Sequence, residues 1–160
     1  MQKIIVNSTP LIVLGNIGYL WILKEMYGEI IIPRAVYDEV TVHNDVASNL
    51  LKSERWIKVD DSVVGADRKM YRARLHAGEV EVMILAQEQA ADMVIIDDNE
   101  AKKTAKYLGL NVTGTLGVLM TARKKDMISS LEEVLEKLEN VGFYIGDELK
   151  ENILRLVGER

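Results

Sequence analysis

Met93-Val94-Ile95-Ile96-Asp97-Asp98-Asn99 is a continuous apolar run that ends in three short polar side chains. A run with no polar interruption is typical of a strand that is buried on both faces, as in a parallel sheet. Helical patterns flank it, from Gly78 to Ala90 before it and from Glu100 to Leu108 after it. The stretch therefore predicts an α/β fold in which helices cover both faces of a parallel sheet.

The same alternation continues outward along the chain. The other predicted strands are short apolar or β-branched runs, at residues 3–6, 30–32, 56–59 and 110–112. The other predicted helices carry apolar side chains at helical spacing, after Asn7, at 19–27, after Pro33, at 46–53, from about 116, at 131–138 and at 147–157. A polar connection is expected from Asp60 to Asp67.

Length and composition limit the class of protein. The 160 residues, 48% of them hydrophobic, predict a single domain over 1–160, with an acidic-site core at about 3–122 and C-terminal helices at about 129–158. The formal net charge of −5 gives no general attraction to nucleic acid or anionic lipid. The absence of cysteine excludes disulfides and thiolate metal sites. With no apolar run near the roughly 20 residues that span a bilayer and no signal-peptide pattern, we expect a cytoplasmic protein.

Polar side chains follow several of the predicted strands. The first strand ends at Asn7-Ser8-Thr9, the central one at Asp97-Asp98, and a later one at Thr113-Gly114-Thr115. In parallel α/β sheets the functional crevice lies beyond the carboxyl ends of the strands, and Glu39 and Glu79 on nearby helices can reach the same edge. Because Mg²⁺ and Mn²⁺ prefer oxygen ligands, such a cluster predicts a divalent-metal site for phosphodiester cleavage.

At this point the sequence resembles the PIN-domain family, in the uncharacterised branch related to VapC-type toxin ribonucleases. Four stretches carry the resemblance in the order of the family motifs, and a fifth is typical of the branch: 5–12, 33–40, 75–81, 95–98 and 112–119. The third contains Gly78-Glu79-Val80-Glu81, similar to the Gly-Glu-x-Glu form of that motif. The resemblance covers residues 4 to about 122 and implies a three-layer PIN-like domain with a parallel sheet of four or five strands.

The resemblance also implies a function and a site. It implies a divalent-metal-dependent ribonuclease that uses Mg²⁺ or Mn²⁺, forms a homodimer and pairs with a small antitoxin-like protein. The implied catalytic residues are Glu39, Glu79 and Asp97, and the implied metal ligands are Asn7, Glu39, Glu79, Asp97 and Asp98. The family spacing from Glu79 favours Asp97, with Asp98 second. Ser8, Thr9 and Thr115 are candidate accessory residues for a metal-bound water or a phosphate.

One departure from the family pattern opens an alternative function. The family usually has aspartate at the first acidic position, where this chain has Asn7. Asparagine keeps a carbonyl oxygen for a metal but lacks the negative charge, so metal affinity and water activation should fall. The alternative is a PIN-like module that binds RNA or protein without catalysis. A phosphoryl-transfer enzyme is a third reading, but its nucleophile would be an aspartate on the first strand.

Each candidate also has a structural explanation. Asp97, Asp98, Ser8, Thr9 and Thr115 suit the capping of the helices that follow them. Glu79 could stabilise the N-terminus of a helix by interacting with the helix dipole, and Glu39 could be a solvated surface charge. His43 and His76 lack partners at the spacing of a catalytic triad and are interpreted as surface or packing residues. The remaining basic candidates, which could meet a phosphate backbone or simply face water, are Lys102, Lys103 and Lys106.

Overall fold

Five parallel strands form the central sheet of the computed structural model, which describes residues 2–64 and 76–160. They are β1 (Ile4–Val6), β2 (Ile30–Pro33), β3 (Ile57–Asp60), β4 (Met93–Ile95) and β5 (Val112–Thr113). The part of the expected 60–67 connection from residue 65 onward lies outside the described residues. The parallel sheet with helices around it confirms the predicted three-layer α/β architecture.

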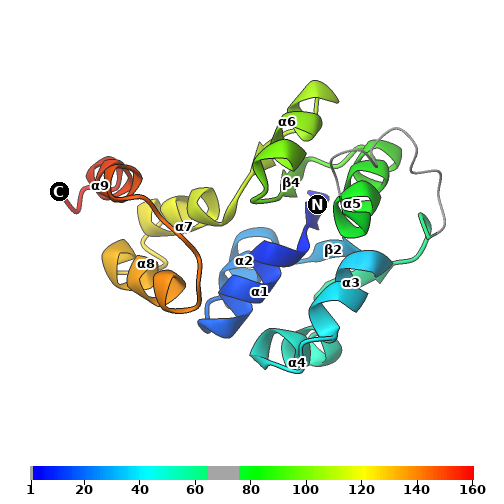
Figure 1. The fold of residues 1–160 in the computed structure, drawn as a ribbon, viewed down its shortest axis with the longest axis horizontal. Coiled ribbons are helices and arrows are strands. Elements are labelled where there is room, and N and C mark those ends of the chain that lie inside the picture. The colour runs from blue at the N-terminus through cyan, green and yellow to red at the C-terminus, as the bar shows by residue number, and fades with distance from the viewer. Residues whose placement is uncertain (1, 65–75) are drawn as a thin grey trace.

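Nine helices flank this sheet within the described ranges (Figure 1). They are α1 (Ser8–Asn16), α2 (Trp21–Tyr27), α3 (Arg34–Thr41), α4 (Val46–Ser53), α5 (Ala77–Glu88), α6 (Asn99–Tyr107), α7 (Thr115–Lys124), α8 (Leu131–Asn140) and α9 (Asp147–Leu156). Figure 1 shows α6 and α4 at opposite ends of the view, with α7, α8 and α9 grouped on one side. No helix in the described part of the chain is long and apolar enough to cross a membrane.

The sheet has the order β3-β2-β1-β4-β5, which places the first strand in the middle. The chain extends the sheet from β1 through β2 to β3 and then returns to add β4 and β5 on the other side of β1. Val6 pairs with Ile95, so β1 and β4 end side by side. Because the strand order reverses between β1 and β4, a crevice is expected beyond their carboxyl ends.

Buried side chains from β1 to α9 form one hydrophobic cluster. The apolar runs that predicted strands are its centre, since the side chains of β1 are at most 1% exposed and Val94 and Ile95 of β4 are 0% exposed. A strand buried on both faces needs such a continuous apolar run, because neither of its faces meets water. The core therefore fixes the strand ends from which the polar side chains project.

The last strand begins later than the sequence pattern predicted. Residues 110–112 were expected to form it, whereas β5 covers Val112–Thr113. The cause is the end of α6, where Gly109 has a φ of +77° and the Leu110 N–H donates to the Ala105 carbonyl at 2.9 Å. This glycine-based helix cap keeps Leu110 on the helix end, so the strand starts two residues further on.

Glu159 joins the segment after α9 to the start of α8. Its Oε2 accepts hydrogen bonds from the Leu131 N–H at 2.6 Å and from Arg123 Nε at 2.9 Å, and its Oε1 accepts one from the Glu132 N–H at 3.1 Å. Burial acts to raise the pKa of Glu159, but these hydrogen bonds outweigh it and hold the pKa below its ordinary value of 4.5. The carboxylate thus satisfies amide groups at the helix N-terminus.

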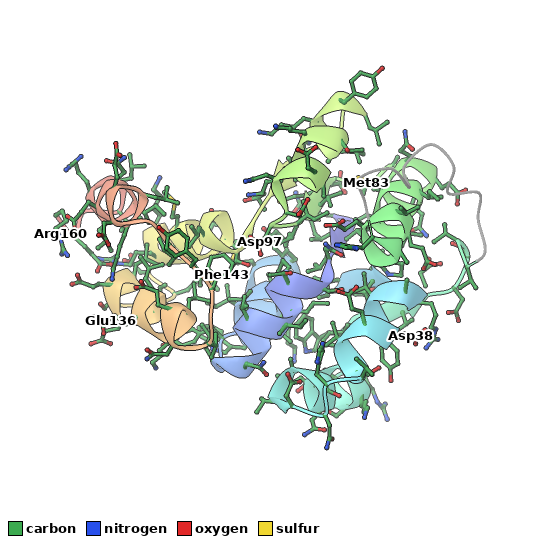
Figure 2. The ribbon with its side chains drawn as sticks, viewed as in Figure 1. Asp38, Met83, Asp97, Glu136, Phe143 and Arg160 are labelled. Atoms are coloured by element: carbon green, nitrogen blue, oxygen red, sulfur yellow. The ribbon has the colours of Figure 1, made fainter. Side chains whose placement is uncertain are left out.

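Replacing Glu159 by glutamine should lower the free energy of unfolding by about 1 kcal/mol near neutral pH. A lowered folded-state pKa stabilises the folded protein above pH 4.5, and this stabilisation disappears as the pH falls through the folded-state value. Urea unfolding of both proteins at neutral and strongly acidic pH measures the difference. Glu136, which is exposed on α8 (Figure 2), provides the matched Glu136→Gln control. A difference that persists unchanged in acid would contradict this role.

Candidate active site

The polar ends of β1 and β4 meet beyond the middle of the sheet. The Asn7 N–H donates to the Ile95 carbonyl at 2.9 Å, which holds the residue after β1 against the end of β4. Asn7 is also the residue before α1, and Asp98 is the residue before α6. Two helix N-termini therefore point into the region where the strand order reverses.

A pocket of ≈ 290 Å³ lies at this point. Its lining is polar and comes from four parts of the chain: the end of β1 with α1, the helix α3, the start of α5 and the end of β4. The lining residues are Asn7, Ser8, Thr9, Glu39, His76, Glu79 and Asp98. The structure thus brings most of the predicted site residues together, although they are up to 91 positions apart in the sequence.

Gly78 allows α5 to approach the site closely. A Cβ atom at this position would lie 2.9 Å from Glu39 Oε2 and 3.7 Å from Asn7 Oδ1. The first of these distances is shorter than an ordinary van der Waals contact, so a side chain here would displace the Glu39 carboxylate. The glycine before Glu79 therefore has a steric reason, and it keeps Glu39 and Asn7 next to the start of α5.

Glu79 is the buried carboxylate of the pocket. It is 5% exposed, and its Oε1 accepts a hydrogen bond from the His76 N–H at 3.0 Å. Burial raises the pKa of Glu79 above its ordinary value, and the carboxylates of Asp98 and Glu39 raise it further, while His76 opposes the rise. A cation in the pocket would stabilise the charged form of this group.

Asn7 and Ser8 present polar atoms that have no hydrogen-bond partner within the described residues. Asn7 Oδ1 and Ser8 Oγ are both buried and unpaired, and the Asn7 side chain does not cap α1. A buried polar atom without a partner carries a free-energy cost, and native proteins rarely leave one without a water, ion or ligand. Both atoms belong to residues that line the pocket, so its contents could pair with them.

The two aspartates after β4 have different surroundings. Both carboxylate oxygens of Asp97 accept hydrogen bonds from Thr115, from its N–H at 2.8 Å and from its hydroxyl at 2.6 Å. Asp97 thereby joins the end of β4 to the start of α7, near the middle of the molecule in Figure 2. Asp98 lines the pocket, and its Oδ1 accepts a hydrogen bond from the Ala101 N–H at 2.9 Å. In this geometry Asp98 faces the site and Thr115 holds Asp97.

Two residues of this region were not predicted as site residues. The sequence pattern favours a surface or packing role for His76, yet this residue lines the pocket. Its position three residues before Glu79, as the residue preceding α5, was the available signal. Glu81 is 2% exposed, and its Oε1 accepts a hydrogen bond from the Ala35 N–H at 3.0 Å in the first turn of α3. It therefore connects the helix that carries Glu79 to the helix that carries Glu39.

The donor set of the pocket fits a hard divalent cation. Carboxylate oxygens from three acidic residues, an amide oxygen and two hydroxyl groups are the ligands that Mg²⁺ and Mn²⁺ prefer. Within the described residues, however, no three His, Cys, Asp or Glu side chains lie close enough together to hold a metal. The chemistry of the donors suits such an ion, and the buried Oδ1 of Asn7 adds a further oxygen beside these acids.

The fold and this pocket define a class: a parallel α/β domain with acidic side chains beyond the strand ends, where the strand order reverses. A family model described as a PIN domain matches residues 3–159, and the chain belongs to this family. PIN domains in general have a nuclease fold, depend on divalent metals and are associated with RNA binding. No match was found among curated proteins.

Proposed function

We propose that this protein is a divalent-metal-dependent ribonuclease that cleaves RNA phosphodiester bonds in a toxin-like role. The observation that supports it best is the buried, unpaired Oδ1 of Asn7 in a pocket that also contains Glu39, Glu79 and Asp98. An oxygen left without a partner beside three acidic residues suits a bound cation better than an empty, purely structural pocket.

Asn7, Glu39, Glu79 and Asp98 would hold the metal, with Mg²⁺ or Mn²⁺ as the ion. When bound, such an ion supplies a Lewis acid that lowers the pKa of water and stabilises charge on phosphate oxygens. We assign Asp98 rather than Asp97 to the ligand set, because Asp98 lines the pocket, whereas both oxygens of Asp97 accept hydrogen bonds from Thr115. Asp97 then contributes as a positioning residue that sets the start of α7.

The chain's own groups can bind and orient the RNA phosphate. The N-terminus of α1 carries partial positive charge and unpaired amide hydrogens, which favour an anion. Ser8 and Thr9 line the pocket in the first turn of this helix, and the buried Ser8 hydroxyl can donate to a phosphate oxygen. His76 lines the same pocket and can contact the substrate as it enters.

A second function is favoured by one feature, the amide at position 7. With Asn7 in place of an acid, the pocket has one negative charge fewer for metal binding and water activation. The same geometry would then serve a PIN-like module that binds RNA or protein without cleaving it. The family membership supports both functions, so cleavage itself distinguishes them.

The homodimer and the small antitoxin-like protein partner rest on the resemblance to toxin ribonucleases. The single domain over 1–160 and the location in the cytoplasm rest on the length and the hydropathy of the sequence. Size-exclusion chromatography with light scattering tests the homodimer. Co-expression with the product of a neighbouring short reading frame tests the antitoxin-like partner.

A metal-titrated cleavage assay on single-stranded RNA tests the proposed function. We expect cleavage with Mg²⁺ or Mn²⁺, none with a chelator, and a loss of at least about ten-fold in the Glu39→Gln variant. Asp38→Asn is the matched control, because Asp38 is exposed at the outer side of the same helix (Figure 2). A wild-type protein that binds RNA but never cleaves it, with any metal, would establish the binding module instead.

A further inference from the structure

The helix α6 begins at the pocket and leads away from it. Its preceding residue, Asp98, lines the pocket, and Figure 1 shows the helix extending outward at the edge of the molecule. Ala101 and Ala105 form its buried side. With about 1.5 Å of rise per residue, the helix carries its outer side chains some 13 Å from the pocket to Tyr107.

The outward side of α6 concentrates positive charge in an otherwise acidic chain. Lys103 and Lys106 are exposed on it and the half-buried Lys102 lies at its flank, against one acidic residue, Glu100, which is 3.9 Å from Lys103. The whole chain has 20 basic and 25 acidic residues. This helix is therefore a local exception that suits a polyanion.

Lys102 connects this charge to the strand ends. A Cβ atom at Gly114 would lie 2.9 Å from Lys102 Nζ and 2.7 Å from Asp97 Oδ1. The ammonium group therefore lies at the edge of the sheet, beside the acid that follows β4. Gly114 leaves the space that this arrangement needs. The row of lysines thus starts beside Asp97, the neighbour of the pocket residue Asp98, and continues along the helix.

Tyr107 ends the helix with an aromatic ring in solvent. It is 90% exposed, which is unusual for a large side chain that could pack elsewhere. It lies one helical turn after Lys103, so the two share the same part of the helix surface. An exposed aromatic ring beside lysines is the combination that binds single-stranded nucleic acid, by base stacking and phosphate contacts.

We propose that the outward face of α6, formed by Lys103, Lys106 and Tyr107 with Lys102 at its flank, binds the single-stranded RNA that enters the pocket. The inference rests on the proposed ribonuclease function and names the substrate as unpaired RNA. The lysines contact successive phosphates, and Tyr107 stacks on a base about 13 Å from the pocket, a span of roughly four stacked nucleotides. Double-stranded RNA offers no free base face to this ring.

Fluorescence anisotropy with a labelled single-stranded RNA of about 12 nucleotides, in a chelator to prevent cleavage, tests the base contact. Tyr107→Ala should weaken binding by about five-fold or more, the effect of losing one stacked base. Tyr144→Ala is the matched control, since Tyr144 is 89% exposed on the segment between α8 and α9. An unchanged affinity in Tyr107→Ala overturns the inference.

The salt dependence of the same binding tests the phosphate contacts. The logarithm of the RNA association constant falls linearly with the logarithm of the salt concentration. Lys103→Gln and Lys106→Gln should each reduce the magnitude of this slope by about 0.7, the value for one phosphate contact on a single strand. Lys52→Gln, on the exposed side of α4 at the opposite end of Figure 1, should leave the slope unchanged. Equal slopes in all three variants overturn the inference, as does a wild-type protein that does not bind the RNA.

Cleavage measured in parallel separates this inference from the proposed function. Binding that depends on Tyr107, without cleavage in any metal, supports the α6 surface and overturns the ribonuclease. Cleavage with a KM that does not change in Tyr107→Ala supports the ribonuclease and overturns the α6 surface. If both hold, Tyr107→Ala raises KM and leaves kcat near its wild-type value.

Discussion

Replacing Glu79 by glutamine is expected to reduce metal-dependent RNA cleavage by about 10²–10³-fold. Glu79 is the most buried carboxylate of the pocket, and the variant loses its charge while keeping an oxygen for the His76 N–H at 3.0 Å. The fold should therefore survive and the reaction should not. Glu88→Gln, at the exposed end of the same helix, is the matched control and should cleave at the wild-type rate.

The same substitution should stabilise the metal-free protein, by about 0.5–2 kcal/mol. Burial and the neighbouring carboxylates raise the pKa of Glu79, so its charged form destabilises the fold above that pKa. The gain in the free energy of unfolding should therefore be greatest at neutral and alkaline pH. It should vanish as the pH falls below 4.5, where the wild-type carboxyl is protonated in both the folded and the unfolded state. Thermal unfolding in a chelator measures it. Wild-type cleavage activity in Glu79→Gln would contradict the assignment of Glu79 to the active site.

Converting Asn7 to aspartate is expected to raise cleavage by about ten-fold or more. The new carboxylate would stand where the unpaired Asn7 Oδ1 now lies, beside Glu39, and would add a full charge to the metal ligands. The metal-free variant should be less stable than the wild type, because a further negative charge enters a buried position next to the buried Glu79 and the exposed Glu39. Initial rates across a Mn²⁺ titration and thermal unfolding in a chelator provide the two measurements.

Asn49→Asp, on an exposed position of α4, is the control for a general effect of the charge. It should change neither the cleavage rate nor the metal dependence. The informative contrary result is a silent wild-type protein whose Asn7→Asp variant cleaves RNA. In that case the pocket is a nuclease site that this chain has lost, and the binding module is its function.

The strands of the core were predictable because their signal is local. A strand buried on both faces must be apolar throughout, so β1, β2 and β4 appear in the sequence as short runs such as Ile30-Ile31-Ile32. Polar residues mark the end of each run, because the chain leaves the buried sheet there and enters a loop. The strand order is set by long-range pairing, such as Val6 with Ile95, and local patterns do not contain it.

The grouping of the candidate residues was predictable from the sequence, and their roles stay predictions. The motif order brought Glu39, Glu79 and the end of β4 to one edge, and the pocket contains that group. Which aspartate faces it depends on Thr115, 18 residues after Asp97, and adjacent aspartates cannot be separated by pattern alone. The role of Asp97 as a ligand stays a prediction, and the geometry favours Asp98.

Calorimetric titration of Mn²⁺ into the metal-free protein tests most directly the claim that this pocket is a metal site. The wild-type protein should bind Mn²⁺ in the pocket, and Glu79→Gln should weaken binding by at least about ten-fold, while Glu88→Gln should bind like the wild type. Equal Mn²⁺ affinity in all three proteins, or no binding in the wild type, would contradict the assignment of Asn7, Glu39, Glu79 and Asp98 as a metal centre.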